Sequence, residues 1–446
     1  TAVGKQALQN NTTGGSNCAF GDQAMQANTT ESNNTAVGYQ ALKDNNAAGN
    51  SAFGFRALYV NTTGTRNQGF GLYALQKNTT ANDNSAFGYN ALNENTTGTR
   101  NTAVGSYSSD SNTTGNYNTA IGYNSLGANT TGTHNTALGD TSLAANTTTN
   151  HNTAVGQGAL QSTTAAYNTA VGSAALNANT TGYNNTAVGY YALQANTTGV
   201  NNVAVGYNAM TANTTGTANV AMGNAAFDAN TTGSNCTAIG SAALSKCDGA
   251  EKNTAVGRQA MYELTSGDDN TAVGYNAMTL LTTGYANVAV GKMAGDNQTV
   301  GYHNVYIGDN AGNTHSTGDR CIYVGRGTDC SGNSVDLEYV FGQGLAGKGT
   351  QTFFAGVNTA AYNEANQSSW TTTSDRRIKK NITNNTTGLD KINQITVRNF
   401  EYKTEDEIKT DNPELTDVVK SAVVNKEGLQ VGSIAQEIEE VLPDVV

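Results

Sequence analysis

The sequence contains very little proline, tryptophan and charge. Of its 446 residues, two are proline and one is tryptophan, and 13% are Asp, Glu, Lys or Arg, about half the fraction in ordinary soluble domains. Low charge combined with abundant Asn, Thr, Gly and Ala also occurs in disordered chains. A disordered segment keeps no register, however, whereas this sequence repeats at a fixed spacing. We therefore expect an ordered repeat protein.

Three further absences exclude classes of partner. The net charge is −11 and no basic stripe is present, which argues against nucleic acid as a partner. No run of 18 apolar residues and no signal-like start occurs, so we predict no membrane span. Because the chain begins inside a repeat, at TAVG, we expect it to be a fragment of a longer protein.

The five cysteines form no Cys-x-x-Cys pair, so a zinc site is not expected. In an oxidising compartment two disulfides are conceivable, Cys236–Cys247 and Cys321–Cys330. The alternative, free small residues at repeat positions, is favoured. The four histidines form no His-x-His motif, and we predict neither a metal nor a cofactor.

What the sequence has in abundance is a repeat centred on glycine. Twenty-one glycines recur from Gly4 to Gly342, and of the twenty intervals eighteen are 17 residues and two are 16. So short a period predicts a solenoid with one coil per repeat and is too short for paired helices. The dominance of Thr, Val, Asn and Gly also disfavours helix. The expected class is therefore mainly β, a parallel β-solenoid or β-roll.

Residues 185–199, NTAVGYYALQANTTG, represent one coil. Numbering the coil from its glycine as position 0, we predict two short strands, at positions −4 to −1 and +1 to +5. A tight bend at the glycine joins them. The polar Asn-Thr-Thr-Gly segment at +7 to +10 is expected to form an exposed second turn.

Each position that recurs from coil to coil has an expected role. Val188 and Leu193 are predicted to form the apolar core, with the small alanines beside them making room for another backbone. Gly189 should supply a positive φ or a place without space for a Cβ. Asn185 should form an asparagine ladder, each amide bonding the coils above and below.

The predicted rod is thin. At a coil spacing of about 4.8 Å, 21 coils extend roughly 100 Å. Because one coil buries little and its small positions invite other chains, we expect an oligomer, most simply a cyclic homotrimer. The NTAVG element also resembles the shorter repeats in the heads of trimeric autotransporter adhesins, which implies a trimeric parallel β-roll.

Two sets of aromatic residues are expected to form surface columns. Tyrosines recur at position +1, where they could stack on sugars, although such a stripe more often covers its own coil or a neighbouring chain. His134 and His151 both lie at position −5 and should stack in adjacent coils as an exposed pair.

The repeat decays towards its end. Tyr306 and Tyr323 replace the alanine of position −2, and Glu338 replaces the asparagine of position −4. We expect these bulky residues to widen or end the roll. The predicted organisation is a rod over 1–342 and a transition segment over 343–373, followed by a separate domain over 374–446.

The last 73 residues have a different character. They hold 10 of the 23 basic and 14 of the 34 acidic residues. Residues 389–395 and 434–442 have helical apolar spacing, the latter ended by Pro443, and 397–403 alternate like a strand. An α+β domain is expected.

Together the phrases SDRRIKKNI, at 374–382, and IAQEIEEVLP, at 434–443, resemble the intramolecular chaperone of endosialidases and other phage tail fibres and spikes (peptidase family S74). The resemblance implies a domain that trimerises the fibre and then cuts itself off. On it Ser374 is the nucleophile, Lys379 the general base and Thr373–Ser374 the scissile bond. Family members run on past the LP element, so the domain is expected to be incomplete.

A lysine serves as a base only where desolvation or neighbouring cations lower its pKa. Five residues on one helix are about 140° apart, so Ser374 must precede the helix or the site must form on assembly. A simpler alternative makes Ser374 an N-cap before a basic helix.

We therefore expect a structural fibre protein, a phage tail fibre that attaches to a host-surface glycan or protein. It would be found on a virion or outside the cell. A bacterial surface adhesin or extracellular fibril is the alternative. A glycan hydrolase is less favoured, because such enzymes usually need a pocket with paired carboxylates, and the repeat offers Asp and Glu only sporadically.

Overall fold

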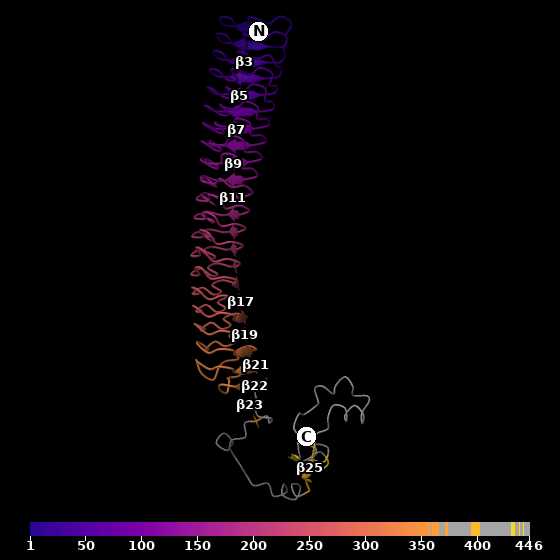
Figure 1. The fold of residues 1–446 in the computed structure, drawn as a ribbon, viewed down its shortest axis with the longest axis vertical. Helices are drawn as coiled ribbons and strands as arrows, with labels where there is room; N and C mark the ends of the chain where they lie inside the picture. The colour runs from indigo at the N-terminus through magenta and orange to yellow at the C-terminus, as the bar shows by residue number, and fades with distance from the viewer. Residues whose placement is uncertain are drawn as a thin grey trace. The chain divides into compact units, whose positions relative to one another are not determined.

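The computed structural model describes residues 1–357, 359–364, 371–372, 394–401, 430–432, 437 and 440. The chain divides into two compact units, Thr1–Thr373 and Ser374–Val446. The first unit is a stack of coils, each contributing one short strand to a single sheet of 24 strands (Figure 1).

The strands of the coils lie parallel and pair residue for residue. Thr186, Ala187 and Val188, for example, face Val203, Ala204 and Val205 of the next coil. The sheet continues in parallel as far as β22 and then closes with two antiparallel strands. The strands of the first unit are β1 (Ala2–Val3), β2 (Cys18–Phe20), β3 (Thr35–Val37), β4 (Ser51–Phe53), β5 (Gln68–Phe70), β6 (Ser85–Phe87), β7 (Thr102–Val104), β8 (Thr119–Ile121), β9 (Thr136–Leu138), β10 (Thr153–Val155), β11 (Thr169–Val171), β12 (Thr186–Val188), β13 (Val203–Val205), β14 (Val220–Met222), β15 (Thr237–Ile239), β16 (Thr254–Val256), β17 (Thr271–Val273), β18 (Val288–Val290), β19 (Val305–Ile307), β20 (Ile322–Val324), β21 (Tyr339–Gln343), β22 (Thr352–Val357), β23 (Thr359–Glu364) and β24 (Thr371–Thr372).

The predicted second strand, at positions +1 to +5, is wrong: this segment is a run of turns. Tyr191 at +2 and Leu193 at +4 have φ of 57° and 52°, in the left-handed region. Their amides still bond to adjacent coils, Tyr191 N donating to Ser173 O at 3.2 Å and Leu193 N to Ala209 O at 3.0 Å. Alternating left-handed residues thus curl the chain without breaking its hydrogen bonding to the coils on either side.

The core of each coil is one side chain thick. Ala187, Ala192 and Leu193 are fully buried, which confirms Leu193 as a core residue. Val188, however, is 36% exposed, so its predicted place in the core is wrong. Successive side chains of a strand point to opposite faces. Because Ala187 points inward into the cluster that also holds Leu193, Val188 must point out, and the small residues serve the chain's own core.

Gly189 meets both predicted conditions. Its φ is +139°, and a Cβ built on it would lie 2.3 Å from the carbonyl oxygen of Gly206 in the next coil. Residues with a side chain rarely adopt this φ, and no space for a Cβ exists at this position. The glycine column therefore fixes the close approach of successive coils.

The expectation that bulky residues end the roll is wrong. Tyr306 and Tyr323 are fully buried, and β19 to β22 continue the parallel pairing. Room for the rings comes from position +4, where Gly295 and Gly312 replace the usual Leu or Met. A Cβ on Gly295 would lie 2.7 Å from the Tyr306 ring. A large residue at −2 is thus offset by loss of the side chain at +4.

In the second unit, β25 (Arg398–Phe400) pairs antiparallel with β26 (Gln430–Gly432), so the strand predicted within 397–403 is present. The guanidinium of Arg398 forms an ion pair with Glu437 at 2.8 Å. Glu437 and Glu440 are helical, whereas Gln394 and Ile395, at the end of the helix predicted over 389–395, are not. The other residues of the two predicted helices lie outside the described residues. Among the residues described, no helix is long and apolar enough to span a membrane.

Candidate functional surface of the solenoid

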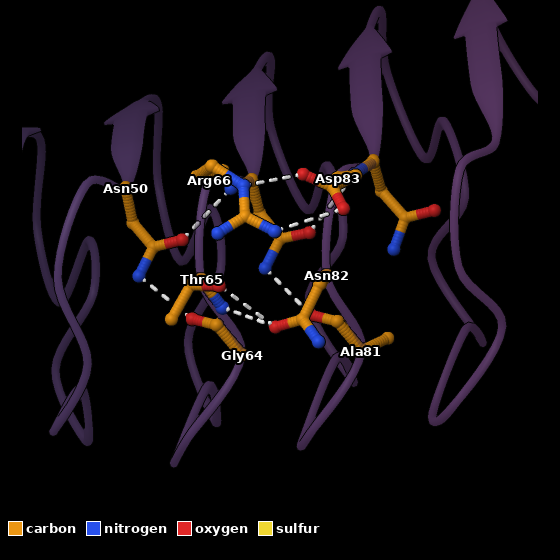
Figure 2. Close-up of polar contacts among 9 residues, drawn as sticks. Asn50, Gly64, Thr65, Arg66, Ala81, Asn82 and Asp83 are labelled. Atoms are coloured by element: carbon orange, nitrogen blue, oxygen red, sulfur yellow. Dashed lines mark hydrogen bonds and ion pairs between the residues drawn. The ribbon is translucent and has the colours of Figure 1, made fainter.

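The asparagine at position −4 links each coil to the next through the backbone. Asn185 Oδ1 accepts from the amide of Asn202 at 3.0 Å, while its Nδ2 donates across its own coil to Gly199 O at 2.9 Å. Figure 2 shows the same pattern at Asn50, whose Nδ2 donates to Gly64 O at 2.8 Å. At Asn185 the predicted amide-to-amide ladder is therefore wrong, because the side chain bonds to main-chain groups. It is present at the same position in later coils, where Asn270 Nδ2 donates to Asn253 Oδ1 and Asn287 Nδ2 to Asn270 Oδ1, both at 3.1 Å.

A true amide-to-amide ladder lies at position +7. Asn196 is fully buried, donates from Nδ2 to Asn179 Oδ1 at 2.7 Å and accepts from Asn213 Nδ2 at 2.9 Å. The Asn-Thr-Thr-Gly segment was expected to be exposed, and for its asparagine and glycine this is wrong. The sequence feature that indicates a buried asparagine is the recurrence of Asn at +7, which an exposed turn does not require.

The ladder is capped wherever it is interrupted. Thr163 stands at +7 in one short coil, and its Oγ1 accepts from Asn179 Nδ2 at 3.1 Å. The last asparagine, Asn230, has no asparagine above it, and its Oδ1 accepts instead from the amide of Gly233 at 2.9 Å. No acceptor of the ladder is left buried without a donor at these breaks, which is what burial of amides requires.

An exposed column of charged and aromatic side chains runs along position −5 over seven coils. Arg66 pairs with Asp83 through two contacts of 2.6 and 3.0 Å (Figure 2). Hydrogen bonding to Arg66 lowers the pKa of the Asp83 carboxyl. His134 and His151 stack with ring centroids 5.0 Å apart, as predicted. The column consists of Arg66, Asp83, Arg100, Tyr117, His134, His151 and Tyr167.

The tyrosines of position +1 are exposed, as a surface column requires. Tyr190 and Tyr207 are 42% and 53% exposed and stack with their centroids 5.6 Å apart. The column is discontinuous, because other coils carry Asp, Ser, Lys or Arg at this position. It offers short aromatic patches rather than one continuous surface.

The last coils contain a buried polar cluster. Tyr306 Oη lies 2.5 Å from Gln298 Oε1 and 2.7 Å from His315 Nδ1. His315 Nε2 lies 3.0 Å from Val335 O, which can only accept, so this nitrogen carries a proton. Burial lowers the pKa of His315.

Glu338 belongs to the same cluster and is fully buried. Its carboxylate accepts from Tyr323 Oη at 3.0 Å and from the amides of Ser331 and Gly349 at 3.1 and 2.7 Å. Among the described residues, these three donors satisfy the buried carboxyl oxygens. The residue expected to mark the decay of the repeat therefore anchors the chain on both sides of β21, through the amides of Ser331 and Gly349.

All five cysteines are free. Burial raises the pKa of Cys236, Cys321 and Cys330 to about 11, so these thiols stay protonated near neutrality. They behave as small core residues, in line with the favoured alternative. No cluster of three or more metal-binding side chains occurs within the described part of the chain.

The residues of the predicted cleavage site, Thr373, Ser374 and Lys379, lie outside the described residues. Residues 374–446 match the model of a family described as the chaperone of endosialidase, Peptidase_S74. The match begins at the residue where the second compact unit begins. No curated protein and no solved structure matched the chain.

Proposed function

We propose that this protein is a structural fibre: a β-solenoid rod assembled as a homotrimer by its C-terminal segment, which acts as an intramolecular chaperone. The observation that carries the proposal is that the repeated positions of residues 1–357 serve contacts between coils. Their strands, glycines and asparagines all serve coil-to-coil contacts, and each coil repeats these contacts with the next. Such a chain specifies length and stiffness.

The domain organisation supports a division of labour between rod and chaperone. We propose a rod over 1–342, a transition over 343–373 and a chaperone domain over 374–446. The support for this division is that the second compact unit and the family match both begin at Ser374. A serine placed at that boundary, with Lys379 nearby in sequence, is suited to cutting one part from the other.

In the proposed cleavage, Ser374 Oγ attacks the carbonyl of Thr373 and Lys379 accepts the hydroxyl proton. The Thr373–Ser374 bond breaks, the proton passes to the leaving amine of Ser374, and water then hydrolyses the ester formed at Oγ. Because the two residues are five apart, the site depends on a non-helical approach or on assembly. Cleavage would then report correct folding.

Attachment to a host surface is the proposed role of the assembled rod, on a phage tail or on a bacterial surface. Its support is the set of ordered exposed side chains at positions −5 and +1, where stacked rings and paired charges present fixed geometry to a ligand. Rigid aromatic groups suit recognition of sugars or protein surfaces at low entropic cost.

The test compares the chain mass and oligomeric state of wild type with those of Ser374→Ala and Lys379→Ala. Lys380→Ala is the matched control, because it removes a neighbouring lysine with no assigned role. We expect wild type and the control to split at Thr373–Ser374 while the other two variants stay whole and trimeric. An uncleaved wild-type trimer would refute cleavage alone, and a wild-type monomer would refute the fibre assembly.

A further inference from the structure

The feature that the fold leaves unexplained is position −1. It holds Val, Phe, Ile, Leu or Met in all 21 coils. Yet thirteen of these side chains are 36–55% exposed and the other eight are partly exposed. Phe53, Phe70 and Phe87 even stack on one another there, at centroid distances of 4.6 and 4.8 Å. We name this column the apolar stripe.

Neighbouring positions show that the stripe is not a general property of the rod surface. Position −3 lies on the same outward face and is Thr or Ser in 13 of the 21 coils, the exceptions being Cys18, Gln68, Val203, Val220, Val288, Val305, Ile322 and Tyr339. Position +1, beyond the glycine, includes Lys5, Asp22 and Arg258. Water therefore accepts polar residues on both sides of the stripe, and the folding of one chain does not require apolar residues within it.

The stripe is large enough for a stable interface. A buried Val, Leu or Phe side chain hides on the order of 100 Å². With more than a third exposed at thirteen of the 21 coils, the stripe leaves roughly 40 Å² at each of these and about 500 Å² together, and the eight partly exposed coils add to this area. That reaches the ~300–600 Å² of the largest patch on a typical monomer and approaches the ~800 Å² per partner of a standard interface.

We propose that the apolar stripe is the surface by which three copies of this chain pack, each facing a common axis along the rod. The proposal rests on the trimer of the proposed function and names its interface. The occupant must present apolar side chains at the coil spacing over the same length. A parallel copy of this chain does so, because its own stripe has the same period and extent.

The test uses the full chain with Val171→Asp, Val188→Asp and Met222→Asp combined, all in the stripe. The matched control combines Thr181→Asp, Thr198→Asp and Thr232→Asp, exposed at +9 of the same three coils. We expect the stripe variant to dissociate at a concentration about 100-fold higher than wild type, because it buries unpaired charges. The control should assemble like wild type, as judged by light scattering and sedimentation.

A milder variant separates weakened assembly from misfolding. Val171→Thr combined with Val188→Thr keeps β-branched residues of equal size, so the coils should retain their β spectrum. It should still weaken assembly about 10-fold, since buried hydroxyls lack partners. A direct readout is Val188→Cys in a Cys18→Ser background. Mild oxidation should link two chains of the trimer through residue 188, whereas Thr198→Cys should give none.

The outcomes separate this inference from the function on which it rests. A stripe variant that assembles as tightly as wild type, or equal cross-linking at residues 188 and 198, would overturn the interface and leave the trimer standing. A wild-type chain that stays monomeric would overturn both.

Discussion

Replacing Asn196 with leucine should destabilise the rod locally by about 1–3 kcal/mol, and the structure identifies which atom is responsible. Asn196 Nδ2 is the donor to the buried Asn179 Oδ1. The other groups that lose Asn196 keep a partner: Gly199 O retains Asn185 Nδ2 at 2.9 Å, and Asn213 Nδ2 retains Gly216 O at 3.2 Å. One orphaned acceptor costs about 1–3 kcal/mol.

The size of leucine is not the difficulty, because Leu264 and Leu281 occupy position +7 in two later coils and are fully buried. The double variant Asn196→Leu/Asn213→Leu therefore makes a sharp control. It removes a second amide but still orphans only Asn179 Oδ1, since Asn230 Nδ2 keeps Gly233 O at 3.1 Å. The double variant should cost about as much as the single one.

Hydrogen exchange is the appropriate assay, because a repeat rod opens locally rather than all at once. Amides of residues 172–213 should exchange roughly 5- to 150-fold faster in the single variant, with residues 51–88 unchanged as an internal reference. A double variant that costs twice the single one would refute the orphaned-acceptor explanation. So would a single variant indistinguishable from wild type.

Three further predictions concern the glycine column, the polar cluster and the thiols. Gly189→Ala should lower the stability of the rod by about 3 kcal/mol, because of the φ of +139° and the close contact with the next coil. Hydrogen exchange should be faster in the adjacent coils, and unchanged exchange would contradict this prediction. Burial lowers the pKa of His315 from 6.5, so the unfolded chain binds its proton first and stability, full above about pH 6.5, falls as the pH drops. Thermal unfolding of the last coils between pH 7.5 and 5 should show this fall, and His315→Asn should flatten it. A thiol-reactive dye at pH 8 should label Cys18 in the folded rod. Cys236 and Cys321, whose burial raises the pKa to about 11, should react only after denaturant is added. Rapid labelling of all the cysteines would contradict their burial.

The sequence was sufficient to predict the period, the parallel solenoid and the role of Gly189. The direction of each side chain was harder. In the strand Thr-Ala-Val, alternation allows two arrangements: either Ala187 faces inward, or Thr186 and Val188 do. The hydrophobicity of valine favours the second arrangement, which is the wrong one. The structure prefers alanine inside because Leu193 already fills the one-residue-thick core. The space inside the coil, and not the apolar character of the side chain, therefore decides which strand residue is buried.

The turn at positions +1 to +5 was unpredictable for a different reason. Leucine is rare at positive φ, so nothing in its identity indicates that Leu193 adopts 52°. The conformation is imposed by bonding to the next coil, which is long-range information. Asn196 was misassigned for a related reason, because Asn-Thr-Thr-Gly has the composition of an exposed turn, and only stacking shows that its amide is buried.

The regular repeat that builds the rod does not define which coil of one chain faces which coil of another. If the apolar stripe packs against copies of itself, a shift by one coil brings nearly identical side chains opposite each other, so the interface alone distinguishes weakly between aligned and staggered trimers. The coils from Gly291 onward differ, with Tyr306, Tyr323 and Glu338 in place of the repeat residues, but these are buried within their own chain. A non-repeating element outside the rod must therefore set the alignment. We expect residues 374–446, which match a chaperone family and contain no such repeat, to start three chains at the same coil.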